Sequence, residues 1–268
     1  MDILTHALFG AVAGTVAASF AKDRKTQIAV IAVSAIGGVL PDLDAVSLLP
    51  GFDGTIGKLL GLAHSGRDIY SAKFWYSHHG FMHSILAGIF SAAAAGLIWF
   101  FIKNGAKSVS FEKIKSFFIS KKLFFAGFMS GWLLHLFGDL PTPSSTWGGI
   151  RMFFPLSAYV GGSGKIWWWN NYDIFLTACA VIAVNAALLL SGKYLKDKIK
   201  FLTVAVFMLG FCFAVYQIET RKSGFSYSGY SEKYREYEQK SKDLQKDILG
   251  ETLYKIMEKL DKRLPFNF

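Results

Sequence analysis

The stretch HSILAGIFSAAAAGLIWFF, residues 83–101, decides the fold class of this chain. It contains no Asp, Glu, Lys or Arg, and its length matches the roughly 20 apolar residues that a helix needs to cross a bilayer. Further apolar stretches of similar character lie at residues 4–20, 27–40, 123–140, 174–190 and 201–218. We therefore expect an all-α, polytopic membrane bundle of about six helices.

The composition supports a membrane protein and argues against a nucleic-acid binder. Of the 268 residues, 52% are hydrophobic and only 18% are charged, yet the formal net charge is +10. A basic and very apolar chain is typical of membrane proteins whose lysines lie in loops. The basic residues form no stripe of the kind that binds nucleic acid, so we expect no such partner. Cys179 and Cys212 lie within apolar stretches and predict neither a disulfide nor a thiolate metal site.

The lysines and arginines predict the orientation of the bundle. The loops at residues 21–26, 103–122 and 192–200 hold thirteen of them, whereas the loops at 50–82 and 141–172 hold five. Because cytoplasmic loops of membrane proteins are enriched in Lys and Arg, the first group is expected in the cytoplasm. The second group and the N-terminus are then expected on the extracytoplasmic side.

The end of the chain differs in character from the rest. We divide the sequence into a membrane-embedded domain, residues 1–218, and an amphipathic helical tail, residues 219–268. An apolar stripe in this tail is expected to consist of Leu244, Ile248, Leu253, Ile256 and Leu260. Two alternatives remain open: a solvated helix packed on the protein, or a helix lying on the lipid surface.

Two shorter patterns make local predictions. The pairs Gly10 with Gly14 and Gly127 with Gly131 have the small-xxx-small spacing that allows close packing of membrane helices. The run KIWWWNNY, residues 165–172, is rich in the aromatic residues that lie at lipid headgroups, so we expect it at the membrane surface.

Ionisable residues occur near the starts of the first and third apolar stretches and near the ends of the second and fourth. Helices that alternate in direction place the start of odd stretches and the end of even stretches on one face, so residues from four segments should meet there. Charged groups at membrane depth are costly and usually face the bundle interior. Imidazole and carboxylate without thiolate are typical ligands of a hard or borderline divalent metal. The candidate metal ligands are His6, Asp42, Asp44, His78, His83, His135 and Asp139.

Four motifs occur in an order that resembles a known family. They are THALFG (5–10), PDLD (41–44), HHGFMHS (78–84) and HLFGDLPTP (135–143). This order resembles the LexA-regulated, membrane-bound metal-dependent hydrolases. The resemblance covers about residues 1–160 and implies a multi-pass protein of the cytoplasmic (inner) membrane. That family is also distantly similar to zinc phospholipase C and P1-type nucleases, which are all-helical and hold several zinc ions.

The chain departs from the family pattern at two positions. His79 stands where the family has arginine, and Met82 stands where it has threonine. If that arginine holds an anionic group of the substrate, Arg67 or Arg151 is expected to replace it here. We also expect Thr142, which belongs to the last motif, to contact the substrate.

Together these features predict an integral-membrane hydrolase that cleaves a phosphate ester of a lipid or lipid-linked substrate. One to three divalent ions, with zinc as the expected metal, would activate water on the extracytoplasmic side. Asp42 or Asp44, if not a ligand, is expected to act as general base, and His79 is expected to donate a proton or to contact the phosphate.

Two other classes of function fit some of these features. A transporter or ion-handling protein can use His and Asp residues within the membrane, although no internal repeat is visible here. A structural membrane protein can hold a metal that has only an architectural role.

Overall fold

The structure, a computed structural model, describes residues 1–105, 109–191, 195, 198–222, 224–227 and 233–264. Lys107, Lys193 and Lys196 of the predicted basic loops lie outside these described residues. Every regular element in the described part is helical, and β-pairing there is limited to two isolated bridges, between Pro143 and Ser163 and between Ile150 and Val160. The predicted all-α class is therefore confirmed.

The helices match the predicted apolar stretches. Their bounds are α1 (Ile3–Ala18), α2 (Arg24–Val39), α3 (Gly66–Ser71), α4 (Ile85–Asn104), α5 (Phe111–Ser120), α6 (Lys122–Asp139), α7 (Tyr172–Leu190), α9 (Lys198–Glu219) and α10 (Lys233–Asp261), with short turns η1 (Leu40–Leu48), η2 (Asp53–Gly57) and η3 (Phe81–His83).

Length and apolar character separate these helices into candidate spans and shorter elements. Within the described residues, four segments qualify as spans: α2 continued through η1, α4, α7 and α9. The bent pair of α5 and α6, which meet at 67°, qualifies as a fifth when counted as one span. The remaining predicted stretch forms α1, an apolar helix of 16 residues. The bundle therefore has four or five spans by this measure, together with the shorter α1.

Part of the predicted basic loop at residues 103–122 is in fact helix α5. Ser110 begins it, because its hydroxyl oxygen accepts a hydrogen bond from the Lys113 amide. Phe117 is buried while Phe111 and Ile119 are exposed, so one side of this short helix packs on the bundle.

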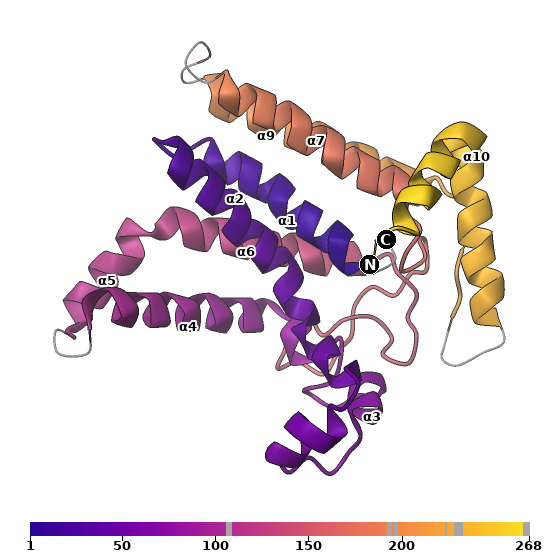
Figure 1. Cartoon of the computed structure of the whole chain (residues 1–268), viewed down its shortest axis with the longest axis horizontal. Coiled ribbons are helices and arrows are strands. Elements are labelled where there is room, and N and C mark those ends of the chain that lie inside the picture. The colour runs from indigo at the N-terminus through magenta and orange to yellow at the C-terminus, as the bar shows by residue number, and fades with distance from the viewer. Residues whose placement is uncertain (106–108, 192–194, 196–197, 223, 228–232, 265–268) are drawn as a thin grey trace.

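The long helices alternate in direction along the chain (Figure 1). Figure 1 shows the C-terminal ends of α1, α4 and α7 at one end of the bundle. The connections 40–84 and 140–171 and helix α10 lie at the other end. The sequence predicts this separation of the loops into two groups.

Small residues hold α2 tightly between α1 and α6. Gly10 and Gly14 of α1, and Gly127 and Gly131 of α6, all face Ser34 of α2 so closely that an added Cβ would meet that residue. Both predicted small-xxx-small pairs thus form close helix contacts. This packing brings the start of α1 and the end of α6 against the C-terminal end of α2.

Replacing Gly131 with alanine is expected to lower the free energy of unfolding by about 1–3 kcal/mol. The new methyl group would overlap the backbone carbonyl oxygen of Ser34, which cannot move without shifting α2. Thermal unfolding in detergent measures this loss. Gly54→Ala is the control, because no atom lies within 4 Å of a Cβ added there. Equal melting temperatures for the two variants would contradict the proposed tight contact.

The tail forms the predicted helix, but it buries a different face. Tyr254 and Met257 of α10 pack against Tyr172 at the start of α7, and the Tyr172 hydroxyl donates a 2.7 Å hydrogen bond to Asp261. Four members of the predicted apolar stripe are exposed instead: Ile248, Leu253, Ile256 and Leu260. The backbone at Gly250 has φ 73°, so the helix kinks there and its two halves do not share one face.

The aromatic run also differs from its prediction. Trp167 is fully buried in a cluster with Phe225 and Tyr227 that joins the connection before α7 to the segment before α10. A buried side chain cannot face lipid headgroups, so the prediction for Trp167 is wrong.

Candidate metal centre

Four segments of the chain bring imidazoles and carboxylates to one end of the bundle. The first turn of α1 carries His6, and the turn η1 that follows α2 carries Asp42 and Asp44. The loop and turn before α4 carry His78, His79 and His83, and the last turns of α6 carry His135 and Asp139. The seven candidate metal ligands and His79 therefore belong to one cluster.

The centre of the cluster is a pair of facing imidazoles between two carboxylates. His83 Nε2 lies 3.2 Å from His135 Nε2. It lies 3.4 Å from Asp42 Oδ1 and 3.6 Å from Asp139 Oδ2. His135 Nε2 in turn lies 3.1 Å from Asp139 Oδ2 and 3.6 Å from Asp42 Oδ1. Each of these atoms can donate a lone pair to the same cation.

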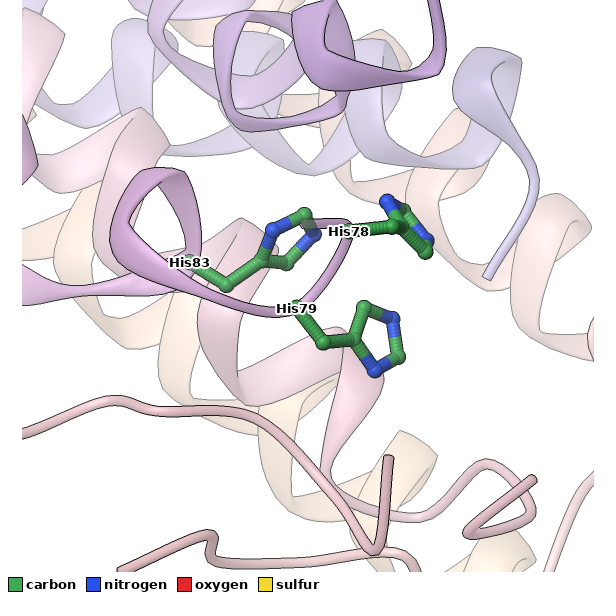
Figure 2. Close-up of side chains that lie close together, drawn as sticks. All are labelled: His78, His79 and His83. Carbon is green, nitrogen blue, oxygen red and sulfur yellow. The ribbon is translucent and has the colours of Figure 1, made fainter. Parts of the chain in front are cut away.

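The second ring nitrogen of His83 extends the cluster toward Asp44. His83 Nδ1 lies 3.3 Å from Asp44 Oδ2, and His78 Nδ1 lies 2.8 Å from Asp44 Oδ1. Figure 2 shows the rings of His78, His79 and His83 close together on one short segment; ring centroids of these residues are 4.3–4.8 Å apart.

His6 closes the other side of the cluster. Its ring stacks on His135 with centroids 3.7 Å apart, and its Nε2 lies 3.1 Å from Asp139 Oδ1. The same carboxylate oxygen accepts a hydrogen bond from the Met1 amino group at 2.6 Å. Asp139 therefore contacts α1 through one oxygen and the imidazole pair through the other.

Backbone carbonyl groups orient two of the imidazoles. His135 Nδ1 lies 2.7 Å from the Gly38 oxygen, and His79 Nδ1 lies 3.0 Å from the Gly149 oxygen. A carbonyl oxygen can only accept, so each Nδ1 carries a proton and a neutral ring keeps a lone pair on Nε2. This arrangement is typical of metal-binding histidines, whose other nitrogen is held by a carbonyl or carboxylate.

Several buried polar atoms in the cluster have no hydrogen-bond partner among the described residues. They include His6 Nδ1. They also include Asp44 Oδ2, Asp139 Oδ2 and His83 Nδ1, which lie at ion-pair distance from other members of the cluster without forming a hydrogen bond. Buried polar groups are nearly always paired, and unpaired carboxylate oxygens are especially costly. A cation between these atoms would satisfy them. Four overlapping groups of three His or Asp residues occur here, and within each group the ligand atoms lie within 4.8 Å of one another. The residues present therefore fit a divalent metal.

Electrostatics differ between two of the loop histidines, His79 and His83. Burial by itself lowers the pKa of His83, but the negative charges of Asp44 and Asp42 outweigh burial and raise the pKa to about 10. For His79, burial and the neighbouring rings of His78 and His83 hold the pKa well below its usual value, so this ring is neutral.

A cavity of about 1040 Å³ adjoins the cluster, at the upper end of the range for ligand pockets. Asp42, His78, His79 and Asp139 lie on its wall. Aromatic residues from distant segments also line it: Tyr70, Trp147, Trp168, Trp169, Tyr227 and Tyr234. Three of the candidate ligands, together with His79, therefore face a space large enough for a substrate.

The three predicted substrate contacts occupy different places. Arg67 lines the cavity. The Arg151 guanidinium group donates hydrogen bonds to the carbonyls of Pro155 and Leu156 and does not line it. The Thr142 hydroxyl donates a 2.7 Å hydrogen bond to the Asp139 carbonyl, so it stabilises the end of α6. The structure thus brings only Arg67 of these three to the cavity.

Sequence reasoning missed two residues that hold His78 in place. The Tyr70 ring stacks on His78 with centroids 4.4 Å apart, and Trp147 packs edge-on to the same ring at 4.9 Å. Both lie in connecting segments outside any recognised motif. No sequence signal marked them.

Comparison with known families identifies the chain. A family model described as YdjM inner membrane protein matches residues 1–222. The chain belongs to this family. The match includes all eight residues of the His/Asp cluster and every predicted apolar stretch, whereas α10 lies beyond it. No curated protein and no solved structure matches the chain. Membership confirms the inner-membrane part of the predicted resemblance, and the hydrolase part stays a prediction.

Proposed function

We propose that this chain is an integral-membrane, metal-dependent hydrolase that cleaves a phosphate ester of a lipid or lipid-linked substrate. The observation that carries the proposal is the set of imidazole and carboxylate atoms that face one another, several without a partner, beside a large cavity. We place this site on the extracytoplasmic side, because the basic loops follow the opposite ends of the helices.

The proposed ligands are His6, Asp42, Asp44, His78, His83, His135 and Asp139. They offer nitrogen and oxygen donors only, a set that suits zinc. The two nitrogens of His83 face different carboxylates, so the cluster has room for one to three ions. A zinc ion there supplies a Lewis acid that makes water acidic enough to attack near neutral pH and offsets phosphate charge.

The chain's own residues would carry out the rest of the reaction. Whichever of Asp42 and Asp44 does not bind the metal would take a proton from the attacking water as the water oxygen bonds to phosphorus; Asp42 lies on the cavity wall. The ester P–O bond breaks, and the leaving oxygen receives the proton that the carboxylate took from water. The neutral His79 ring could relay this proton, because its Nε2 carries a lone pair that first accepts the proton and then releases it. Arg67 on the same wall would bind the anionic phosphate.

The direct experiment measures metal and hydrolysis in the purified protein. We expect at least about one zinc per chain by elemental analysis, because the site offers the four or more ligands that zinc requires. Phosphatidic acid in vesicles serves as the first substrate. Chelation should abolish phosphate release, and added zinc should restore it. Metal-free protein with unchanged function would end the proposal, and zinc flux into liposomes without any product would favour a transporter.

A further inference from the structure

A second cavity, different in character, lies between α1, α6, α7 and α9. Its volume is about 410 Å³, and its wall is almost entirely apolar. The residues that define it include Phe9, Val12, Ala178, Val181, Phe211 and Ala214. We call it the apolar groove. It offers few hydrogen-bonding groups, so its natural occupant is hydrocarbon.

The apolar groove meets the metal centre at the end of α6. Gly138 lies on the wall of the groove, and its neighbour Asp139 lies on the wall of the larger cavity. Met1 lines both spaces. A single molecule can therefore place a polar group near the carboxylates and an apolar chain between the helices.

The length of the groove matches one leaflet of a bilayer. Along α9 the lining residues run from Phe207 to Glu219, a distance of about 18 Å at 1.5 Å per residue. Half of the hydrocarbon core of a bilayer is about 15 Å thick. The groove thus begins at the level of the metal centre and ends near the middle of the bundle.

We infer that the apolar groove binds one hydrocarbon chain of a phosphate-bearing membrane lipid and holds its headgroup at the metal centre. This inference rests on the proposed function and adds a determinant of substrate class. The length of the lipid's hydrocarbon chain would be recognised in the apolar groove, and its phosphate would be recognised in the larger cavity on the other side of the end of α6. The protein would then prefer esters that carry a long chain.

The test uses a lipid probe whose binding needs no hydrolysis. Vesicles containing phosphatidic acid with a photoreactive diazirine in its acyl chain are irradiated with the full-length protein, and labelled peptides are mapped by mass spectrometry. We expect labels on the groove-facing residues of α7 and α9. Ala214→Trp, which fills the groove, should lower this labelling about tenfold, a change equivalent to about 1.4 kcal/mol.

Ala183→Trp is the matched control, because Ala183 is an exposed residue of α7 that does not line the groove. Its labelling should equal that of the unmodified protein. If Ala214→Trp fails to fold, as judged by gel filtration, the smaller Ala214→Leu takes its place. Equal labelling of the filled and control variants would overturn the inference.

A hydrolysis assay distinguishes failure of this inference from failure of the proposed function. Phosphatidic acid in vesicles and bis(p-nitrophenyl) phosphate, which has no hydrocarbon chain, are compared as substrates. Filling the groove should lower the ratio of lipid hydrolysis to soluble-ester hydrolysis. No metal-dependent hydrolysis of either by the unmodified protein would sink the proposed function, whereas an unchanged ratio with clear activity would sink only the role of the groove.

Discussion

Protein with Asp42 replaced by asparagine is expected to purify with little or no zinc and to lose metal-dependent hydrolysis. Asp42 Oδ1 lies 3.4 Å from His83 Nε2 and 3.6 Å from His135 Nε2. Asparagine keeps the shape of the side chain and removes the charge that holds a cation there. Replacing a residue that only hydrogen-bonds to a metal ligand lowers metal affinity about 10- to 100-fold. Loss of a ligand itself should therefore lower zinc affinity at least about 100-fold.

Elemental analysis and a zinc titration measure this effect. Asp68→Asn is the matched control: Asp68 is an exposed residue of α3 whose carboxylate accepts a hydrogen bond from Ser65. It should keep its metal and its activity. If the Asp42 variant bound zinc as tightly as the control variant, Asp42 would not be a ligand and the proposed arrangement would be wrong.

Replacing Arg221 with methionine should cost about 3–5 kcal/mol of the free energy of unfolding, because it leaves a buried charge without its partner. Arg221 Nη2 contacts both oxygens of Asp173 at 2.8 Å, and the two side chains are 1% and 0% exposed. Gln245 of α10 also donates to Asp173, at 3.0 Å. The variant should therefore lose both stability and the attachment of α10 to α7.

Chemical unfolding in detergent and limited proteolysis of α10 check this expectation. Lys165→Met is the control, because Lys165 and Glu219 form an ion pair with side chains 38% and 60% exposed. Exposed pairs contribute at most about 1 kcal/mol. Similar stability in both variants would show that the buried pair does not fasten the tail.

Much of the fold and of the His/Asp cluster could be predicted, because the lipid environment restricts which residues a membrane-spanning helix can contain. Long apolar stretches specify helices, since every backbone polar group in lipid must be satisfied within the helix. An ionisable residue such as His135 in such a stretch is costly, so its presence marks a site. The close helix contacts at the glycine pairs that face Ser34 could also be predicted, because two glycines four residues apart lie on one helix face and allow another helix to approach closely.

The predictions that failed relied on short sequence patterns, whereas the structure at those places depends on contacts or bends that such patterns do not encode. The lysines of α5 resemble those of a basic loop, so the sequence predicts a loop where the structure has a helix. The stripe on α10 assumed one continuous helix, and the kink at Gly250 divides it. The charge and the predicted outer-face position of Arg151 suggest a substitute for the missing arginine, but nearby carbonyls bind its guanidinium group, and it does not line the cavity.

The sequence by itself determined that the chain is a helical membrane protein and which histidines and aspartates would gather at one end of its helices. Those results follow from hydrophobic length and from the alternating direction of successive helices, which are properties of short segments. Only the tertiary structure decided which atoms face one another: His6 meets Asp139 across 133 positions of sequence, and His135 is oriented by the carbonyl of Gly38. Such contacts depend on how closely the helices pack, and that distance is set by all the side chains between them.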